Sequence, residues 1–267
     1  MVLIHGFDSH PDIWRGTERL LREAGRVPIL LHWRPKEAGQ DTRETALEVV
    51  LPAIRDGLVA AGFDADAPFD AITHSMGGLV MRVLLEHAAE HEDPTLPSRV
   101  GSLAMLSPPH RGAHTGIASI ACDSYRDLAW RDVACDLKPG SPLLEALGDR
   151  KPDHVPTRYL SIGVATAAPF FLVPLYDGDG DGRPAGHDNA VMAESGWLPG
   201  PGSDFVVWRG WDRPDHFTSP CSAEVNRWIL EFLDAGVVPT PAKGRVRGGD
   251  ACAGLSKAEW RARHGYE

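Results

Sequence analysis

Short apolar stretches alternate along this chain with longer stretches that have helical spacing. Strand-like runs at 27–33, 69–73 and 100–106 lie among amphipathic segments at 12–24 and 76–91. Alternation of this kind favours a parallel sheet, because a crossover helix joins each strand to the next. We therefore predict an α/β fold with a mostly parallel sheet of about six strands and helices on both faces. The other predicted strands cover 2–4, 158–164 and 205–208, and the other predicted helices cover 42–61, bent near Pro52, and 222–233.

The length and composition fit one large domain. The 267 residues, 43% of them apolar, can bury one sizeable core. We expect this domain to span residues 1–238. A small cap or lid insertion is expected at about 108–156, where Pro, Gly, Asp and Arg interrupt the alternation. Residues 239–267 are expected to form a peripheral C-terminal tail.

The charge and hydropathy patterns exclude several classes of partner. A formal charge of -10 argues against nucleic acid or an anionic membrane as a partner. No apolar stretch is long enough to span a bilayer, and no basic-plus-apolar leader precedes the first strand.

Localisation stays open: cytoplasmic by default, and secreted if the N-terminus has been trimmed. The oligomeric state cannot be read from the sequence.

The four cysteines do not form a C-x-x-C pair, which disfavours a zinc ribbon or a thioredoxin-like site. Cys122 and Cys135 flank one short segment, and a disulfide between them would staple it. Cys221 could anchor the polar tail through Cys252. Four unrelated thiols remain the alternative, because connectivity cannot be read from sequence.

A serine separates the apolar run at 69–73 from two glycines. T-H-S-M-G at 73–77 fits the frame G-x-S-x-G, with Thr73 in the first position. This frame puts the serine on a strained strand-to-helix turn and directs the helix N-terminus at a developing oxyanion. We expect Thr73 and Gly77 to crowd each other, so that the branched Thr73 opens the turn slightly. Ser75 is therefore a predicted nucleophile.

A serine nucleophile needs a histidine base and an acid that orients the histidine. In proteins that use this type of turn, the acid and then the histidine come after the serine in the sequence. Among twelve histidines, His216 lies between the last predicted strand and the last predicted helix. Loops in that position emerge at the carboxyl edge of the sheet, where active sites lie. Asp188 is the predicted acid, and the apolar residues that follow it could fix its carboxylate below the histidine.

Two backbone amides are candidates for an oxyanion hole. Gly6 ends the first predicted strand and lets the chain turn, so that the amide of Phe7 can donate. The amide of Met76 follows the nucleophile directly. Two donors at this place would stabilise the oxyanion, and losing one typically costs about 10² to 10³ in rate.

The segment D-G-D-G-D-G supplies rival acids and a candidate calcium site. Asp177, Asp179 and Asp181 have calcium-loop spacing, with a glycine at the sixth position. The twelfth position is Asp188, where such a loop expects a bidentate Glu. One carboxylate cannot easily serve calcium and the catalytic histidine together, which disfavours a full EF-hand. A looser calcium site at the three aspartates and a solvated turn both remain open.

Six segments of the chain match a pattern shared by known proteins. They are V-L-I-H-G-F at 2–7, T-H-S-M-G-G at 73–78, S-P-P-H-R-G at 107–112, D-L-K-P-G-S-P-L-L at 136–144, D-N-A-V at 188–191 and D-H-F at 215–217. Together they resemble small bacterial lipases and lipase-like serine esterases of the α/β-hydrolase superfamily, over most of the chain to about Leu233. The resemblance implies an α/β-hydrolase fold with a minimal sheet, and ester hydrolysis through an acyl-enzyme without an organic cofactor. It also implies that His110 and Arg111 are structural or entrance residues.

The predicted function is therefore hydrolysis of a carboxylic ester or a lipid-like small molecule by a Ser-His-Asp triad. We expect an apolar acyl pocket, lined partly by residues 117–147 and by A-P-F-F-L at 168–172. An acyltransferase, a thioesterase or a polyester depolymerase would use the same site. A non-catalytic binding protein with a hydrolase fold is the alternative from a different class.

Overall fold

The computed structural model describes residues 1–90, 93–113, 122–123, 128–166, 188, 190–191, 193–210, 216 and 219–236. It confirms the predicted α/β fold. Six strands form one sheet in the order β2-β1-β3-β4-β5-β6, and each neighbouring pair is parallel. The strands are β1 (Val2–Ile4), β2 (Ile29–Leu31), β3 (Phe69–His74), β4 (Val100–Leu106), β5 (Arg158–Thr166) and β6 (Ser203–Gly210).

The helices lie between the strands, as the alternation predicts. The long helix predicted at 42–61 consists of two α-helices joined by a π-helical turn directly before Pro52, which has no N–H to donate. The α-helices are α1 (Arg15–Glu23), α2 (Thr42–Thr45), α3 (Leu51–Ala60), α4 (Met76–Glu86), α5 (Leu96–Arg99), α7 (Leu128–Cys135), α8 (Pro142–Leu147) and α9 (Ala223–Ala235). The π-helical turn is η2 (Ala46–Val50), and the 3-10 turns are η1 (Pro11–Trp14), η3 (Ala88–Glu90), η4 (Ala193–Gly196) and η5 (Ser219–Cys221).

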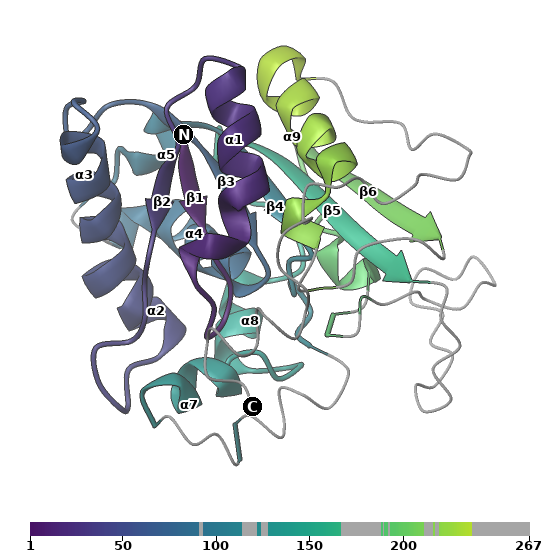
Figure 1. The fold of residues 1–267 in the computed structure, drawn as a ribbon. Helices are drawn as coiled ribbons and strands as arrows, with labels where there is room; N and C mark the ends of the chain where they lie inside the picture. The colour runs from purple at the N-terminus through teal and green to yellow at the C-terminus, as the bar shows by residue number, and fades with distance from the viewer. Residues whose placement is uncertain are drawn as a thin grey trace.

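The sheet separates two apolar clusters. In β1, Val2 and Ile4 belong to one cluster and Leu3 belongs to the other, because successive strand residues point to opposite faces. The first cluster contains buried side chains of α3 and α4, and the second contains those of α1 and α9. Figure 1 shows α1 and α9 next to each other on the near face of the sheet. The helices therefore cover both faces, as predicted.

Helix α4 is buried along its whole length, although it carries two charged side chains. Arg82 and Glu86 pair with each other one turn apart, with 2.8 Å between Arg82 Nε and Glu86 Oε1. Arg82 also donates to the carbonyl oxygens of Leu147 and Gly148 at the end of α8, at 2.7 and 3.2 Å. This buried ion pair therefore connects the helix that follows Ser75 to the segment predicted as a cap.

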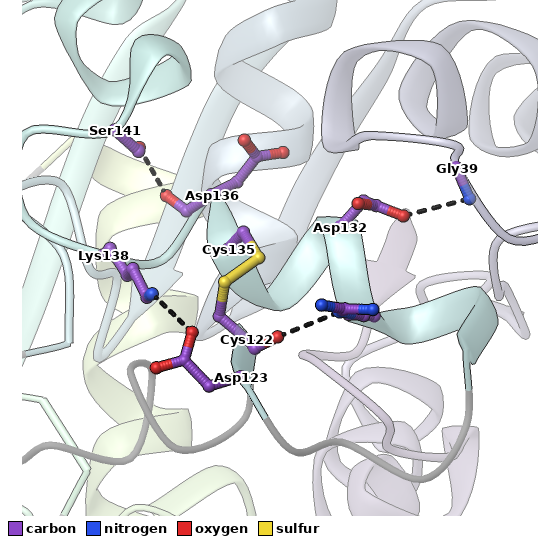
Figure 2. The surroundings of a disulfide bond; sticks show 9 residues. Gly39, Cys122, Asp123, Asp132, Cys135, Asp136, Lys138 and Ser141 are labelled. Carbon is purple, nitrogen blue, oxygen red and sulfur yellow. Dashed lines mark hydrogen bonds and ion pairs between the residues drawn. A yellow bond between two sulfur atoms is a disulfide. The ribbon is translucent and has the colours of Figure 1, made fainter.

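The predicted cap segment carries α7 and α8, at the lower edge of the sheet in Figure 1. Cys122 and Cys135 form a disulfide, which fulfils one of the pairings that their spacing allowed. Figure 2 shows this bond at one end of α7, with Asp132 on the same helix accepting a hydrogen bond from the Gly39 amide at 2.9 Å. The disulfide joins α7 to the segment at 122–123, and the hydrogen bond of Asp132 joins it to the loop between β2 and α2.

Several predictions fall outside the described residues. They concern Asp177, Asp179 and Asp181, the apolar run at 168–172, the pairing of Cys252, and the tail at 239–267. The boundaries of the domain, cap and tail stay predictions. Within the described part of the chain, no helix combines the length and the apolar character needed to cross a bilayer.

Candidate active site

Ser75 occupies the turn between β3 and α4. Its backbone has φ 52° and ψ -127°, in a region that residues with a side chain rarely adopt. The Ser75 amide donates to the Leu106 carbonyl on β4 at 2.8 Å, and the Gly78 amide donates to the Ser75 carbonyl at 2.9 Å. The neighbouring strand and the first turn of α4 thus both stabilise the strained conformation.

Gly77 is required by its closeness to β1. A Cβ atom on Gly77 would lie 2.7 Å from the carbonyl oxygens of both Ile4 and His5, which real Cβ atoms do not tolerate. Thr73 is paired with Ile4 in the sheet and is not among the nearest neighbours of that position. The expectation that Thr73 and Gly77 crowd each other stays a prediction. The steric limit comes from the end of β1, because α4 begins directly against its carbonyl groups.

Ser75, His216 and Asp188 form one hydrogen-bonded chain. The Ser75 hydroxyl lies 2.9 Å from Nε2 of His216, and Nδ1 of His216 lies 2.7 Å from Oδ2 of Asp188. Nδ1–H donates to the carboxylate, so the neutral ring presents an unprotonated Nε2 to the serine. These residues are 141 and 28 positions apart in the chain, and each is buried. The arrangement allows Nε2 to take the proton of a serine hydroxyl.

The carboxylate of Asp188 is held by the backbone on its other side. Its Oδ1 accepts hydrogen bonds from the amides of Ala190 and Val191 at 3.0 and 2.8 Å. Burial raises the pKa of Asp188, but the charge and hydrogen bond of His216 and the Val191 amide outweigh it, so the pKa lies below its usual value. Asp188 therefore stays ionised at neutral pH, although it is fully buried.

His5, at the end of β1, fixes the loop that carries Phe7. Nδ1–H of His5 donates to the Gly6 carbonyl at 2.8 Å, and Nε2 accepts from the Trp33 amide at 3.3 Å. The His5 ring also stacks on Trp33, with 5.5 Å between ring centroids. Burial lowers the pKa of His5 to about 3, so this side chain is neutral at pH 7.

The two candidate oxyanion donors reach the serine by different routes: Met76 follows it directly in the chain, and Phe7 belongs to the loop after β1. A Cβ on Gly6 would lie 2.8 Å from Ser75 Cβ, so the β1 loop passes directly beside the serine and Phe7 continues from there. The Phe7 ring packs edge-on against Trp130 of α7, with 5.0 Å between centroids. Met76 is buried and opens α4. The structure thus brings both residues to Ser75.

Two residues of the resemblance lie away from this chain of hydrogen bonds. His110 is buried, with Arg82 donating to its Nδ1 and its Nε2–H directed at the Ser161 hydroxyl, each at 3.4 Å. Burial, with the Arg82 charge, holds the pKa of His110 well below its usual value. Arg111 stacks over the Trp197 ring at 5.1 Å. Both positions fit the structural or entrance role that the resemblance implies.

Sequence analysis missed the roles of His5 and His74. Both are buried, and both hold backbone carbonyls around Ser75: His5 that of Gly6, and His74 that of His216. Their position at strand ends and beside glycine or serine is a signal, but their partners cannot be read from the sequence. Among the described residues, no group of three or more metal-ligating side chains comes together. The candidate calcium residues are outside that set.

Comparison with solved structures identifies the fold. The mature lipase BlEst2 of Bacillus licheniformis is 19% identical with a TM-score of 0.57, over 87% of this chain and 89% of that one. EstA of Clostridium botulinum is 15% identical with a TM-score of 0.55, over 86% and 85% of the two chains. The lipase of Staphylococcus hyicus is 15% identical with a TM-score of 0.51, over 87% and 94%. The chain has an α/β-hydrolase fold. The predicted resemblance to lipases and esterases is confirmed at the level of this fold.

Comparisons of sequence are less informative. No protein-family model matches the chain. A D-alanine–D-alanine ligase of Bordetella petrii is 34% identical over 133 residues, which are 48% of this chain and 39% of the ligase. The chain thus spans less than half of the length of that relative. At this coverage the match does not identify a family for the α/β-hydrolase chain.

Proposed function

We propose that the protein is a serine hydrolase that cleaves carboxylic esters through an acyl-enzyme. One observation carries the proposal: a serine on a strained strand-to-helix turn lies 2.9 Å from a histidine that an ionised, buried aspartate orients. This is the arrangement by which a weak nucleophile is activated, and it is recognised by geometry rather than by sequence position. The α/β-hydrolase fold and its lipase and esterase neighbours support the same reaction class.

In the acylation step, Ser75 Oγ attacks the ester carbonyl carbon and its proton passes to Nε2 of His216. The carbonyl oxygen becomes negative, and the amides of Phe7 and Met76 are the proposed donors to it. Asp188 stabilises the imidazolium that forms, without taking its proton. His216 then donates that proton to the alcohol oxygen as the C–O bond breaks, which releases the alcohol.

Deacylation repeats the sequence with water as the nucleophile. His216 takes one proton from water as the oxygen attacks the acyl carbon. The bond to Ser75 Oγ then breaks, and His216 returns the proton to the serine. This cycle needs no organic cofactor. A calcium ion at Asp177, Asp179 and Asp181 would contribute to stability or substrate binding rather than to these steps.

The proposed substrate is an ester or a lipid-like small molecule. A non-catalytic binding protein would be expected to have a distorted contact between Ser75 and His216, and the 2.9 Å distance counts against it. An acyltransferase would use the same acyl-enzyme, with an alcohol in place of water. Added alcohol would then shift the products without changing the rate of ester loss.

The test is hydrolysis of p-nitrophenyl esters across acyl lengths, with and without a chelator. Ser75→Ala and His216→Ala should each lose several orders of magnitude in kcat, on the order of 10⁴ or more. Ser102→Ala and His154→Ala are matched controls, since Ser102 lies within β4 and His154 hydrogen-bonds the Glu86 carbonyl, both apart from the candidate site. The controls should keep the activity of the parent.

The dependence of the hydrolysis rate on the acyl length of the ester separates an esterase from a lipase. Loss of activity on chelation alone would support a calcium requirement. If the parent is inert on every ester, or if Ser75→Ala retains its activity, the proposed hydrolysis is refuted.

A further inference from the structure

His74 is adjacent to the proposed nucleophile in the chain and contacts the backbone of the proposed base, but the proposed reaction does not use it. It is the last residue of β3 and directly precedes Ser75. Its side chain reaches across to the loop of His216, 142 positions later, where 2.8 Å separates His74 Nε2 from the His216 carbonyl oxygen. The two rings face each other with 4.6 Å between centroids and a tilt of 47°.

The contact fixes the protonation of His74. A carbonyl oxygen only accepts, so Nε2 must carry the hydrogen. Nδ1 has no hydrogen-bond partner among the described residues, and it points toward the Gly6 backbone, where an added Cβ would lie 3.3 Å away. Burial holds the pKa of His74 well below its usual value, and His216 adds to this effect. His74 is therefore a neutral donor at the pH at which an ester hydrolase would work.

A neutral His74 side chain is electrostatically favourable beside His216. The titratable groups around His74 are His216, Asp188 and His5. In the proposed reaction His216 becomes positively charged, and a second positive ring 4.6 Å away would oppose that charge. A neutral imidazole donates the same hydrogen bond without this repulsion.

The His216 backbone is held from three directions. Its amide donates to the Asp188 carbonyl at 2.8 Å, and its carbonyl accepts from the Ser219 hydroxyl at 3.2 Å as well as from His74. Of these partners, only His74 is covalently joined to Ser75. It therefore ties the backbone of the base to the strand that carries the nucleophile.

We infer that His74 is a positioning residue, whose Nε2–H holds the His216 backbone so that the imidazole stays in reach of Ser75 Oγ. The inference rests on the proposed function, because it assigns His216 the role of base. Small displacements of a catalytic group cost large factors in rate, about 10²-fold for roughly 1 Å. Removing the donor should thus lower kcat and leave substrate binding unchanged.

Three variants isolate the donor. His74→Gln keeps an N–H at the reach of Nε2, His74→Met fills similar space without a donor, and His74→Asn carries a donor that is too short. We expect His74→Met and His74→Asn to lower kcat for a p-nitrophenyl ester about 10- to 100-fold at unchanged KM. We expect His74→Gln to recover most of the loss. His154→Met is the control and should match the parent.

A second readout does not depend on turnover. Proton NMR follows the Nδ1 hydrogen shared by His216 and Asp188, which gives a low-field signal when the ring is held. The signal should persist in the parent and in His74→Gln, and it should be lost or broadened in His74→Met. Thermal unfolding identifies any variant that does not fold. If His74→Met does not fold, the inference is tested by comparing His74→Gln with His74→Asn.

Either of two results would overturn the inference. One is a donor-free variant that folds and has the kcat and the low-field signal of the parent. The other is a His74→Gln protein that folds but is no better than His74→Met. A parent that is inert on esters would instead refute the proposed hydrolysis, and the NMR signals of the variants would still report whether His74 positions His216.

Discussion

Acidification from pH 7 to pH 5 should destabilise the fold through His5. This side chain is fully buried, donates to the Gly6 carbonyl and accepts from the Trp33 amide. Its folded-state pKa is about 3, against 6.5 in the unfolded chain. The unfolded state therefore binds the proton first as the pH falls. The stability that neutral His5 contributes is complete above pH 6.5 and is lost progressively toward pH 3.

The magnitude follows from linkage. Between pH 7 and pH 5 the unfolded histidine becomes almost fully protonated while the folded one stays neutral. Integrated from pH 7 to pH 5, the extra proton binding of the unfolded state corresponds to about 1.4 pH units. At about 1.4 kcal/mol per pH unit, it lowers the free energy of unfolding by roughly 2 kcal/mol. This is a large part of the stability of a typical domain.

The assay is urea unfolding of the parent and of His5→Gln at both pH values. His5→Gln removes this titration, while buried His74 and His110, whose pKa values are also lowered, titrate in both proteins and cancel in the comparison. The parent should lose about 2 kcal/mol more than the variant between pH 7 and pH 5. Equal losses in the two proteins would refute the assignment of His5 as a buried neutral group.

Three further substitutions test other contacts. Asp188→Asn should lower kcat about 10⁴-fold, because the imidazole loses its orienting charge, and an ester assay that finds less than a tenfold loss would contradict that role. The disulfide between Cys122 and Cys135 has a sequence separation of 13, so breaking it with a double serine substitution should cost about 3 kcal/mol. Thermal scans should show that a reductant lowers the Tm of the parent more than that of the double variant. Arg82→Met should cost about 3–5 kcal/mol in urea unfolding, because Glu86 stays buried without its partner. Replacing both with Met and Leu should recover most of this cost, and a double variant as unstable as the single one would show that the ion pair is not the cause.

The sequence predicts much of this fold because its decisive signals are local. The alternation of apolar runs with amphipathic segments predicts a mostly parallel sheet of about six strands, and the described residues form one parallel sheet of six strands. The turn at Ser75 is also local, since an apolar strand, a serine and two glycines are adjacent. Chain order predicts the other two residues: His216 lies between the last strand and the last helix, and Asp188 lies before it, after the strand that begins at Arg158. In the structure, His216 is hydrogen-bonded to Ser75 on one side and to Asp188 on the other.

What the sequence could not predict depends on contacts between distant segments. Arg82 and Glu86 are spaced like an exposed helical pair, yet every residue of α4 is buried. The need for Gly77 arises from the carbonyl oxygens of Ile4 and His5, about seventy positions earlier. Nothing in the local sequence around His74 predicts that its side chain contacts the carbonyl of His216. Spacing alone does not give such contacts, because they are fixed by how the segments pack.

The most direct test of the account is labelling with a serine-directed phosphonate, followed by mass spectrometry of the intact protein and its peptides. The account predicts one adduct per chain, located on Ser75, absent in Ser75→Ala and formed far more slowly in His216→Ala. An unlabelled parent, or an adduct that persists in Ser75→Ala, would contradict the central claim that Ser75 is a nucleophile activated by His216.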